Sequence, residues 1–345
     1  MSGSSLDGLD ICHGMFTHNA KGWNYQILHA ETLPFTPEWR ASLKTASQSQ
    51  AIKLAETDHQ FEVWMGQKVL EFMGKYQIEK TDLIASHGHT LFHAPEKGFT
   101  TQIGSGAALA AVTNIPTISD FRSLDVALGG QGAPLVPIGD KLLFPEYGYC
   151  LNLGGYGNIS YRNRGQRIAF DICPVNKVIN YLASRENMEL DRDGQMGQAG
   201  NLLPSLLKRL NQLDFYHMQG PKSLGDDWLN NRFLPIIEAY KTYPVQDLLR
   251  TVYQHIAEQI AQATQHNQKK TILTTGGGAY NTFLIECIQH ETAHSIILPD
   301  PLLIDFKEAL VFAFMGVLRN ENEINCLSSV TGAKKDSSGG IIHIV

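Results

Sequence analysis

Apolar runs that end in Gly or Asp recur along this chain, and they constrain its fold more than any other feature. We read as strands the runs DLIAS before His87, YCLNL before Gly154, RIAF before Asp171 and KTILTT before Gly276. Helical periodicity alternates with them, which predicts helices near 47–75, 104–113, 175–184, 200–212, 246–265 and 306–319. This alternation predicts an α/β protein with mixed sheets flanked by helices. Ligands of such sheets bind beyond the strand ends, where these Gly and Asp residues lie.

Chain length, net charge and cysteine spacing limit the possible domain organisation, binding partners and compartment. A chain of 345 residues exceeds the size at which single cores stop growing, so we expect two lobes. The formal net charge of −6 offers no basic surface for nucleic acid, and no apolar run is long enough to span a membrane. The five cysteines are widely spaced without a C-x-x-C pair, which argues against a disulfide framework or a zinc ribbon. Since a signal peptide is also absent, we expect a cytoplasmic protein.

The opening segment SGSSLDG at 2–8 combines glycines, hydroxyls and a carboxylate. Glycine lets successive backbone N–H groups converge on one point, which makes a cradle for phosphate oxygens. Asp7 or Asp10 would then be placed to hold a metal ion. The alternative is a flexible N-terminus without a ligand.

Two further glycine turns follow strands. LNLGGYGNISY at 151–161 predicts a strand, a Gly-Gly turn and a returning strand, and a plain β-hairpin is its alternative interpretation. ILTTGGGAYNTFL at 272–284 places three glycines between a strand and a helix that begins near Asn281, where a nucleotide can approach the backbone. Neither the P-loop spacing nor an opening G-x-G-x-x-G is present, so we expect separate glycine turns to hold a nucleotide between the lobes.

Asp171 follows the apolar run RIAF and precedes Pro174, so we expect it at the end of a strand. A carboxylate that is partly desolvated in a cleft has a raised pKa and suits a general base. The alternative role is to cap a helix that begins near Val175.

An arginine lies between carboxylates in SDFRSLDVALGGQGAPLVP at 119–137. Arg122 beside Asp120 and Asp125 suits a polar small molecule that carries hydroxyls and a carboxylate, whereas a salt-bridged surface loop is the alternative. SHGHTLFH at 86–93 contains an H-x-H pattern that can bind zinc, which leaves a zinc hydrolase as a competing hypothesis. We expect hydrogen bonding in a polar pocket for these histidines instead.

These residues carry a resemblance to a known family. MSGSSLDGLD resembles the M-S-G-T-S-x-D-G-x-D signature of the anhydro-N-acetylmuramic acid kinases. Further similar segments follow in order: SHGHT, QIGSGAALA, DFRSLDVALGGQGAPLVP, LNLGGYGNIS, FDICPVN, DRDGQMGQAG, PKSLG, TTGGGAYN, EALVFAF and SVTGA. The resemblance covers essentially the whole chain.

The resemblance implies a two-lobed actin-like ATPase and sugar kinase fold with the active site in the interlobe cleft. We expect an N-terminal lobe at 1–130 plus 311–345 and a C-terminal lobe at 131–310. The implied reaction opens the internal ether of the anhydro sugar with water and places the γ-phosphoryl group of ATP on the 6-oxygen, with ATP and Mg²⁺ as cofactors. The implied partner is the small sugar, with no nucleic acid and no membrane, and a homodimer is left open.

The same matching assigns residue roles. Asp171, in the position of the family's F-D-x-G-P-G-N, would be the base that activates water. The ATP phosphates would contact Gly3, Ser4, Ser5, Leu6, Asp7, Gly8, Leu9 and Asp10, with Gly154, Gly155 and Asn158 as the second turn and Asp7 on the metal. The adenosine would contact Gly276, Gly277 and Gly278, with Asn281 beside them. The sugar would contact Gln102, Arg122, Asp125 and Glu308.

Three departures from the family pattern affect these expectations. Cys173 and Val175 replace glycines after the base, and His89 replaces a Gln. Relatives carry a β-strand before the M-S-G motif, and the sequence begins at that Met, so we expect the first phosphate turn to be tethered on one side only. A catalytically weak actin-like sugar-binding, nucleotide-binding or regulatory protein is therefore the second functional hypothesis.

Overall fold

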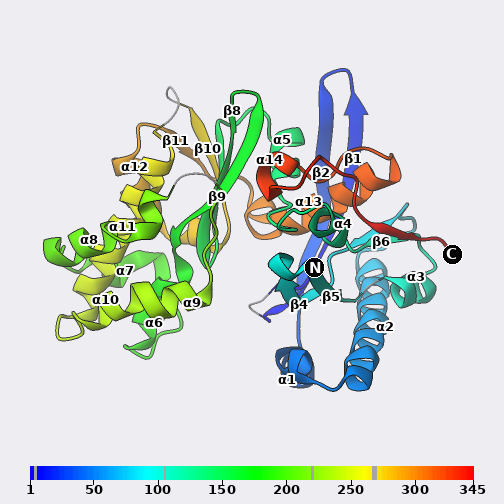
Figure 1. Ribbon diagram of the computed structural model, residues 1–345, viewed down its shortest axis with the longest axis horizontal. Helices are drawn as coiled ribbons and strands as arrows, with labels where there is room; N and C mark the ends of the chain where they lie inside the picture. The colour runs from blue at the N-terminus through cyan, green and yellow to red at the C-terminus, as the bar shows by residue number, and fades with distance from the viewer. Residues whose placement is uncertain (4–5, 105, 219–220, 266–269) are drawn as a thin grey trace. The chain divides into compact units, whose positions relative to one another are not determined.

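The structure is a computed structural model that describes residues 1–345 except 4–5, 105, 219–220 and 266–269. The chain forms two compact units (Figure 1). Unit 1 comprises Met1–Leu143 and Phe306–Val345, and unit 2 comprises Phe144–Asp305. Both units contain strands and helices, so the predicted α/β class with mixed sheets flanked by helices is confirmed.

Unit 1 contains a long hairpin and two small sheets. Strand β1 (Gly8–Asn19) pairs antiparallel with β2 (Gly22–Pro34). The sheet β12-β6-β3 consists of β12 (Ile341–His343), β6 (Thr117–Ser119) and β3 (Ile84–Ser86), and β4 (His89–Ala94) pairs with β5 (Phe99–Ile103). The helices are α1 (Pro37–Thr45), η1 (Ala46–Gln48), α2 (Ala51–Lys75), η2 (Pro95–Lys97), α3 (Ala107–Thr113), α4 (Ser123–Ala127), α5 (Pro137–Leu142), α14 (Ser328–Thr331) and most of α13 (Pro301–Asn320).

The core of unit 1 forms where α2 and α3 cover the start of β1. Phe61 and Met65 on α2 pack with Leu9 of β1 and Leu109 of α3, and all four side chains are buried. Because Phe61 and Met65 are four residues apart, both lie on the same face of the helix. This packing fixes the first residues of β1.

Unit 2 is built on a five-stranded sheet in the order β11-β10-β7-β8-β9. Its strands are β7 (Tyr149–Leu153), β8 (Tyr156–Asn163), β9 (Gln166–Pro174), β10 (Thr271–Thr275) and β11 (Ser295–Ile297). β10 is parallel to β7 and β11, whereas β8 is antiparallel to β7 and β9. The helices are α6 (Asn176–Ser184), η3 (Arg192–Gly194), α7 (Gln195–Gln198), α8 (Pro204–Asn211), η4 (Asp214–His217), α9 (Asp226–Trp228), η5 (Leu229–Phe233), α10 (Leu234–Glu238), α11 (Val245–Ala263), η6 (Gly277–Tyr280) and α12 (Thr282–Glu291).

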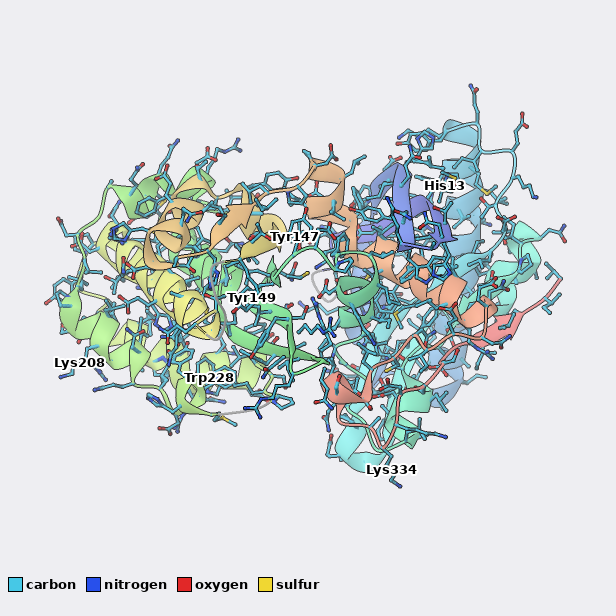
Figure 2. The ribbon with its side chains drawn as sticks, turned by 90° about the horizontal axis from the view of Figure 1, so that it is seen from above. His13, Tyr147, Tyr149, Lys208, Trp228 and Lys334 are labelled. Atoms are coloured by element: carbon cyan, nitrogen blue, oxygen red, sulfur yellow. The ribbon has the colours of Figure 1, made fainter. Side chains whose placement is uncertain are left out.

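Helix α11 supplies much of the core of unit 2. Its apolar stripe, predicted from periodicity, is fully buried and consists of Leu248, Leu249, Val252, Ile256 and Ile260. Tyr149 of β7 is buried in the same cluster, where Figure 2 shows it among the packed side chains. Leu151 and Leu153 are buried in the same cluster, so the end of β7 from which the second glycine turn departs is held in the core.

The borders between the units differ from the predicted ones. They fall after Leu143 and after Asp305, not after 130 and 310. Within unit 1, α5 and α13 share a buried contact, in which Lys307 Nζ lies 2.6 Å from Asp140 Oδ1. A Cβ on Gly139 would come within 2.3 Å of Val311, so these helices pack backbone to side chain. Glu308, expected in the C-terminal lobe, therefore belongs to unit 1.

The other elements agree well with expectation. The predicted helix at 200–212 is shorter, as α8, and the one at 246–265 is α11. Within the described residues, no helix combines the length and apolar character needed to cross a membrane.

The buried pair of Lys307 and Asp140 yields a stability prediction. Lys307→Ala should lower the free energy of unfolding by about 3–5 kcal/mol, because it leaves a carboxylate buried without its cation. Urea denaturation would measure the loss. The double variant Asp140→Asn with Lys307→Met is the control, since it buries no lone charge; an equal loss in both variants would contradict the electrostatic explanation.

Candidate active site

The first glycine turn lies at the start of β1 in unit 1. Ser2 forms bridges to Leu9, antiparallel, and to His89, parallel. Its hydroxyl lies 3.0 Å from His89 Nδ1, and its N–H donates to the carbonyl oxygen of Gly88 at 3.3 Å. The expectation of a turn tethered on one side is therefore wrong at Ser2, which is held from both sides.

The residues of this turn divide into those that support it and those that face outward. Leu9 is buried in the core, and a Cβ on Gly8 would come within 2.4 Å of the Leu33 carbonyl oxygen. Leu6 also packs on that core, so only the backbone of these three residues is available to a nucleotide. Asp7 is exposed. Ser4 and Ser5 lie outside the described residues, and Gly3 is half-buried.

Arg122 has a fixed guanidinium group. Its Nε donates to His87 Nε2 at 2.9 Å, and one terminal nitrogen donates to the Gly132 carbonyl oxygen at 2.6 Å. Burial, followed by the charge of Arg122, holds the pKa of His87 well below its usual value, so His87 is a neutral acceptor. Two bonds use only part of the five N–H donors of an arginine. Arg122 is therefore oriented and retains donors for a ligand.

The position of Asp125 does not support the sugar contact that we expected for it. The side chain is buried, and its oxygens accept bonds from the Gly132 N–H at 2.8 Å, the Thr331 hydroxyl at 2.7 Å and the Cys326 thiol at 3.1 Å. Because Arg122 binds the carbonyl oxygen of the same Gly132, Asp125 fixes the loop that orients the arginine. Buried polar oxygens are costly unless they receive hydrogen bonds of this kind.

Two carboxylates and Arg122 interact electrostatically in unit 1. Desolvation by the surrounding protein raises the pKa of Glu308; Arg122 lowers it and Asp10 raises it. The Glu308 side chain nevertheless reaches solvent, so a ligand can contact it. Asp10 accepts a bond from the Thr32 hydroxyl at 2.6 Å. Gln102 on β5 donates to Thr100 Oγ1 at 2.8 Å and is half-buried.

In unit 2, the second and third glycine turns meet at the end of β7. A Cβ on Gly276 would come within 2.6 Å of Asn152 Oδ1, and one on Gly278 within 2.8 Å of the Leu153 side chain. Gly276 has φ +82°, which a residue with a side chain rarely adopts. Asn176, at the start of α6, donates to the Leu153 carbonyl oxygen at 3.0 Å. The two turns predicted separately thus form one surface.

These turns leave backbone donors unused. The carbonyl oxygens of Gly154 and Gly155 accept bonds from the start of α6, whereas their own N–H groups have no backbone acceptor among the described residues. The N–H groups of Gly277 and Gly278 are likewise without a backbone acceptor in that part of the chain. Backbone amides of glycine turns that lack an acceptor suit phosphate oxygens. This is the property that distinguishes the segment from a plain hairpin.

A row of polar residues crosses the sheet beside these turns. Asn152, Asn158 and Asp171 are directly opposite one another on β7, β8 and β9. Directly opposite residues share a face of an antiparallel sheet, so the three side chains project from one face. Asn158 thus lies on β8 beyond the turn in which we expected it, next to Asp171.

Asp171 lies inside β9 and not at the end of a strand, because β9 continues to Pro174 through a bulge at Ile172. Its Oδ2 accepts a bond from the Leu224 N–H at 2.8 Å. The alternative role of capping a helix is wrong, since α6 begins at Asn176 without a side-chain cap. Desolvation raises the pKa of Asp171, and the bond from Leu224 opposes this.

The side chain of Asn281 makes hydrogen bonds within the protein. Its oxygen caps α12 by accepting from the Leu284 N–H at 3.0 Å, and its amide donates to Tyr253 Oη at 2.8 Å. Tyr253 in turn donates to the buried carboxylate of Asp191 at 3.0 Å. The adenosine contact expected of Asn281 is thus not supported by its position. Reasoning from sequence missed Asp191 and Tyr253, although DRDGQMGQAG begins at Asp191 and was a signal for this segment.

The histidines form hydrogen bonds, as predicted. His87 and His89 bind Arg122 and Ser2, and His93 Nδ1 lies 3.2 Å from Thr100 Oγ1. Among the described residues, no group of three or more His, Cys, Asp or Glu side chains is placed to hold a metal ion. The H-x-H pattern is thus used in hydrogen bonding.

Comparison with known proteins identifies the family. The model of the family described as "Anhydro-N-acetylmuramic acid kinase" matches residues 1–344. The chain belongs to this family. The kinase of this name from Actinobacillus pleuropneumoniae serotype 3 (strain JL03) is 32% identical over 368 residues, which cover 99% of this chain and 97% of the relative. The one from Aliivibrio fischeri (strain ATCC 700601 / ES114) is 32% identical over 362 residues, with the same two coverages.

Solved structures are more distant. A ROK family glucokinase from Streptomyces griseus, in complex with glucose and AMPPNP, shares 12% sequence identity at a TM-score of 0.37 and covers 84% of this chain and 91% of its own. Membership of the anhydro-N-acetylmuramic acid kinase family makes the chain a sugar kinase and favours the kinase over the weak binding protein.

The raised pKa of Asp171 predicts a pH-dependent stability difference. Because the folded state favours the protonated carboxyl, ionisation costs stability once the pH rises through the folded pKa. Asp171→Asn, which stays neutral and can still accept from Leu224, should therefore be as stable as the wild type or more stable at pH 7. This gain should vanish as the pH falls below the ordinary value of 3.8. Urea denaturation at several pH values would measure it; a variant less stable at pH 7 would contradict the argument.

Proposed function

We propose that this kinase uses ATP and Mg²⁺ to convert 1,6-anhydro-N-acetylmuramic acid and water into N-acetylmuramic acid 6-phosphate and ADP. The observation that carries the proposal is the position of Asp171, desolvated and in one row with Asn158 beside glycine turns with unused amides. Family membership supports the same substrate.

Asp171 is the general base. Its carboxylate takes a proton from water as the water oxygen attacks the anomeric carbon, and the bond from that carbon to the 6-oxygen breaks. The released 6-oxygen attacks the γ-phosphorus of ATP in line, and the bond to the β–γ bridging oxygen breaks, so that ADP leaves. The bond from Leu224 keeps one carboxylate oxygen oriented while the other faces the water. A raised pKa makes the carboxylate a stronger base for this step.

Backbone amides hold the phosphates. The N–H groups of Gly154, Gly155, Gly277 and Gly278 supply donors that need no rearrangement when charge develops during phosphoryl transfer. In unit 1, the turn before β1 is proposed to supply further backbone N–H donors to the phosphates. Asp7 is exposed and Asp10 half-buried, and carboxylate oxygens suit Mg²⁺, which binds one or two of them together with substrate phosphates and water. When bound, Mg²⁺ neutralises phosphate charge.

The sugar binds in unit 1 near Arg122. The guanidinium, oriented by His87 and by the loop that Asp125 holds, suits the carboxylate of the sugar's lactyl group. Glu308 and Gln102 are proposed to accept and donate hydrogen bonds to the remaining polar groups. Asp125 is a positioning residue in this scheme and does not touch the sugar.

Removing the base tests the mechanism. Asp171→Asn should lower kcat by roughly 100-fold or more, because an amide cannot accept the proton from water. A phosphoryl-transfer assay with the anhydro sugar would measure it, with plain glucose as the substrate that should not be turned over. Near-normal turnover by a folded variant would contradict the assignment of Asp171.

A substitution in the third glycine turn, at Gly277, tests the proposed nucleotide contact. A Cβ on Gly277 would have Asn176 Nδ2, at 3.7 Å, as its nearest protein neighbour, so Gly277→Ala should fold normally and place a methyl group where the nucleotide approaches. We expect KM for ATP to rise roughly tenfold, at unchanged thermal stability, from this loss of close approach. Gly225→Ala, whose Cβ would meet no protein atom within 4 Å, is the control and should leave KM unchanged. Equal kinetics for both variants would remove Gly277 from the nucleotide site.

A further inference from the structure

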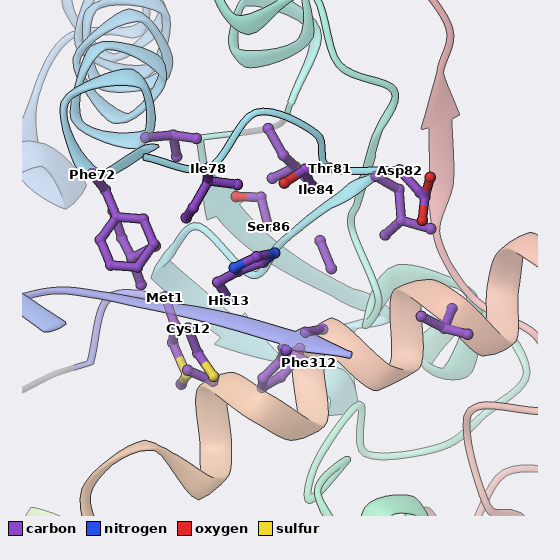
Figure 3. Close-up of a pocket in the computed structure, with 18 of the residues that line it drawn as sticks. Met1, Cys12, His13, Phe72, Ile78, Thr81, Asp82, Ile84, Ser86 and Phe312 are labelled. Atoms are coloured by element: carbon purple, nitrogen blue, oxygen red, sulfur yellow. The ribbon is translucent and has the colours of Figure 1, made fainter. Parts of the chain in front are cut away.

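The edge of β9 beside Asp171 is covered by a segment that is not a strand. β9 is the last strand in the order of its sheet, with β8 on one side. On the other side, the Asp171 N–H donates to the Lys222 carbonyl oxygen at 2.9 Å. In unit 1, by contrast, the stretch of β1 with Cys12 and His13 borders a cavity (Figure 3). The backbone of Asp171 is thus paired on the outer side of its strand.

Segment 222–226 holds Asp171 at two points. Besides the backbone bond to Lys222, the Leu224 N–H donates to Asp171 Oδ2 at 2.8 Å. A carboxylate whose main chain and side chain are both bonded to one short segment has little freedom to turn. The position of segment 222–226 therefore sets the direction in which the second carboxylate oxygen points.

Lys222 anchors the amino end of this segment. Its Nζ donates to the Phe215 carbonyl oxygen at 2.8 Å and lies 4.5 Å from the centroid of the Phe215 ring. A cation at this distance from an aromatic ring is attracted to it. Because Phe215 is buried in the core of unit 2, this end of the segment is attached to the core.

Asp226 anchors the carboxyl end of the segment. Its Oδ1 accepts hydrogen bonds from the Tyr156 hydroxyl, at 2.7 Å, and from the Lys177 ammonium. Tyr156 directly follows Gly155 of the second glycine turn. A Cβ on Gly155 would lie 3.1 Å from Lys177 Cγ, so the stem of this lysine packs on the same turn. Asp226 therefore joins segment 222–226 to the second glycine turn.

Tyr156 lies on the same side of the sheet as Asp171. It is two residues before Asn158 on β8, and Asn158 is directly opposite Asp171, so the three side chains share a face. Desolvation raises the pKa of Tyr156, and the hydrogen bond to Asp226 and the negative charge of Asp171 raise it further. Tyr156 therefore stays protonated and remains a donor to Asp226.

We propose that Asp226 is a positioning residue for the base. It holds segment 222–226 against the second glycine turn, and the Leu224 N–H of that segment orients Asp171. The inference rests on the proposed function, in which Asp171 activates water and the glycine turn binds phosphates. Through Asp226, the base keeps a fixed position relative to the phosphate-binding amides. The Asp226 side chain is 61% exposed, so its ion pair adds little to stability and its effect should appear in catalysis.

Substitution of Asp226 tests the proposal in a phosphoryl-transfer assay with ATP and the anhydro sugar. Asp226→Ala should lower kcat roughly tenfold, at unchanged KM for ATP and unchanged thermal stability, because the base loses its orientation. Asp226→Asn keeps an oxygen that accepts from Tyr156 and Lys177, so it should retain kcat within roughly twofold. Asp227→Ala, which removes the neighbouring exposed carboxylate, is the matched control and should leave kcat unchanged. A normal kcat for Asp226→Ala would overturn the proposal.

A combination with Asp171→Asn shows whether Asp226 acts through the base. If it does, Asp226→Ala should lower the kcat of the Asp171→Asn variant by less than roughly twofold, because the base that it orients is already absent. A further tenfold loss would assign Asp226 a different role and overturn this proposal, while the proposed function would stand. Near-normal turnover by Asp171→Asn itself would overturn both, since no base would then remain to be positioned.

Discussion

The parallel pairing of β10 with β7 is the constraint on which the proposed nucleotide half-site depends. Thr275 lies opposite Asn152, so both strands end at the same level and the two glycine turns leave the sheet side by side. The contacts that a Cβ would make at Gly276 and Gly278 show why side chains are excluded there. Because the two turns lie close together, there is no room for side chains between them, and their amide groups remain free for phosphates.

A different principle builds the half-site in unit 1. There a buried carboxylate, Asp125, collects donors from three segments, among them Gly132 and Thr331. The loop held in this way fixes Arg122, and His87 stays neutral beside it because burial and the arginine disfavour a second positive charge. The proposed sugar site thus depends on buried polar hydrogen bonds, whereas the proposed nucleotide site depends on backbone without side chains.

Much of this site was predictable from the sequence because its chemistry is local. Glycine runs after strands indicate turns, and an acidic residue after RIAF indicates a candidate base, since each depends on neighbours in the chain. Asn281 and Asp125 were assigned to ligands by matching the motifs of the family. Their partners, such as Tyr253 and Thr331, lie far away in the sequence, so their structural roles were not readable from it.

The sequence by itself determined the α/β class, the glycine turns, the candidate base and the resemblance that the family match confirms. Tertiary structure alone decided which polar groups remain free. It also placed the unit borders after Leu143 and after Asp305. The physical reason is that strand pairing and burial join residues across long sequence separations, where neither periodicity nor spacing carries a signal.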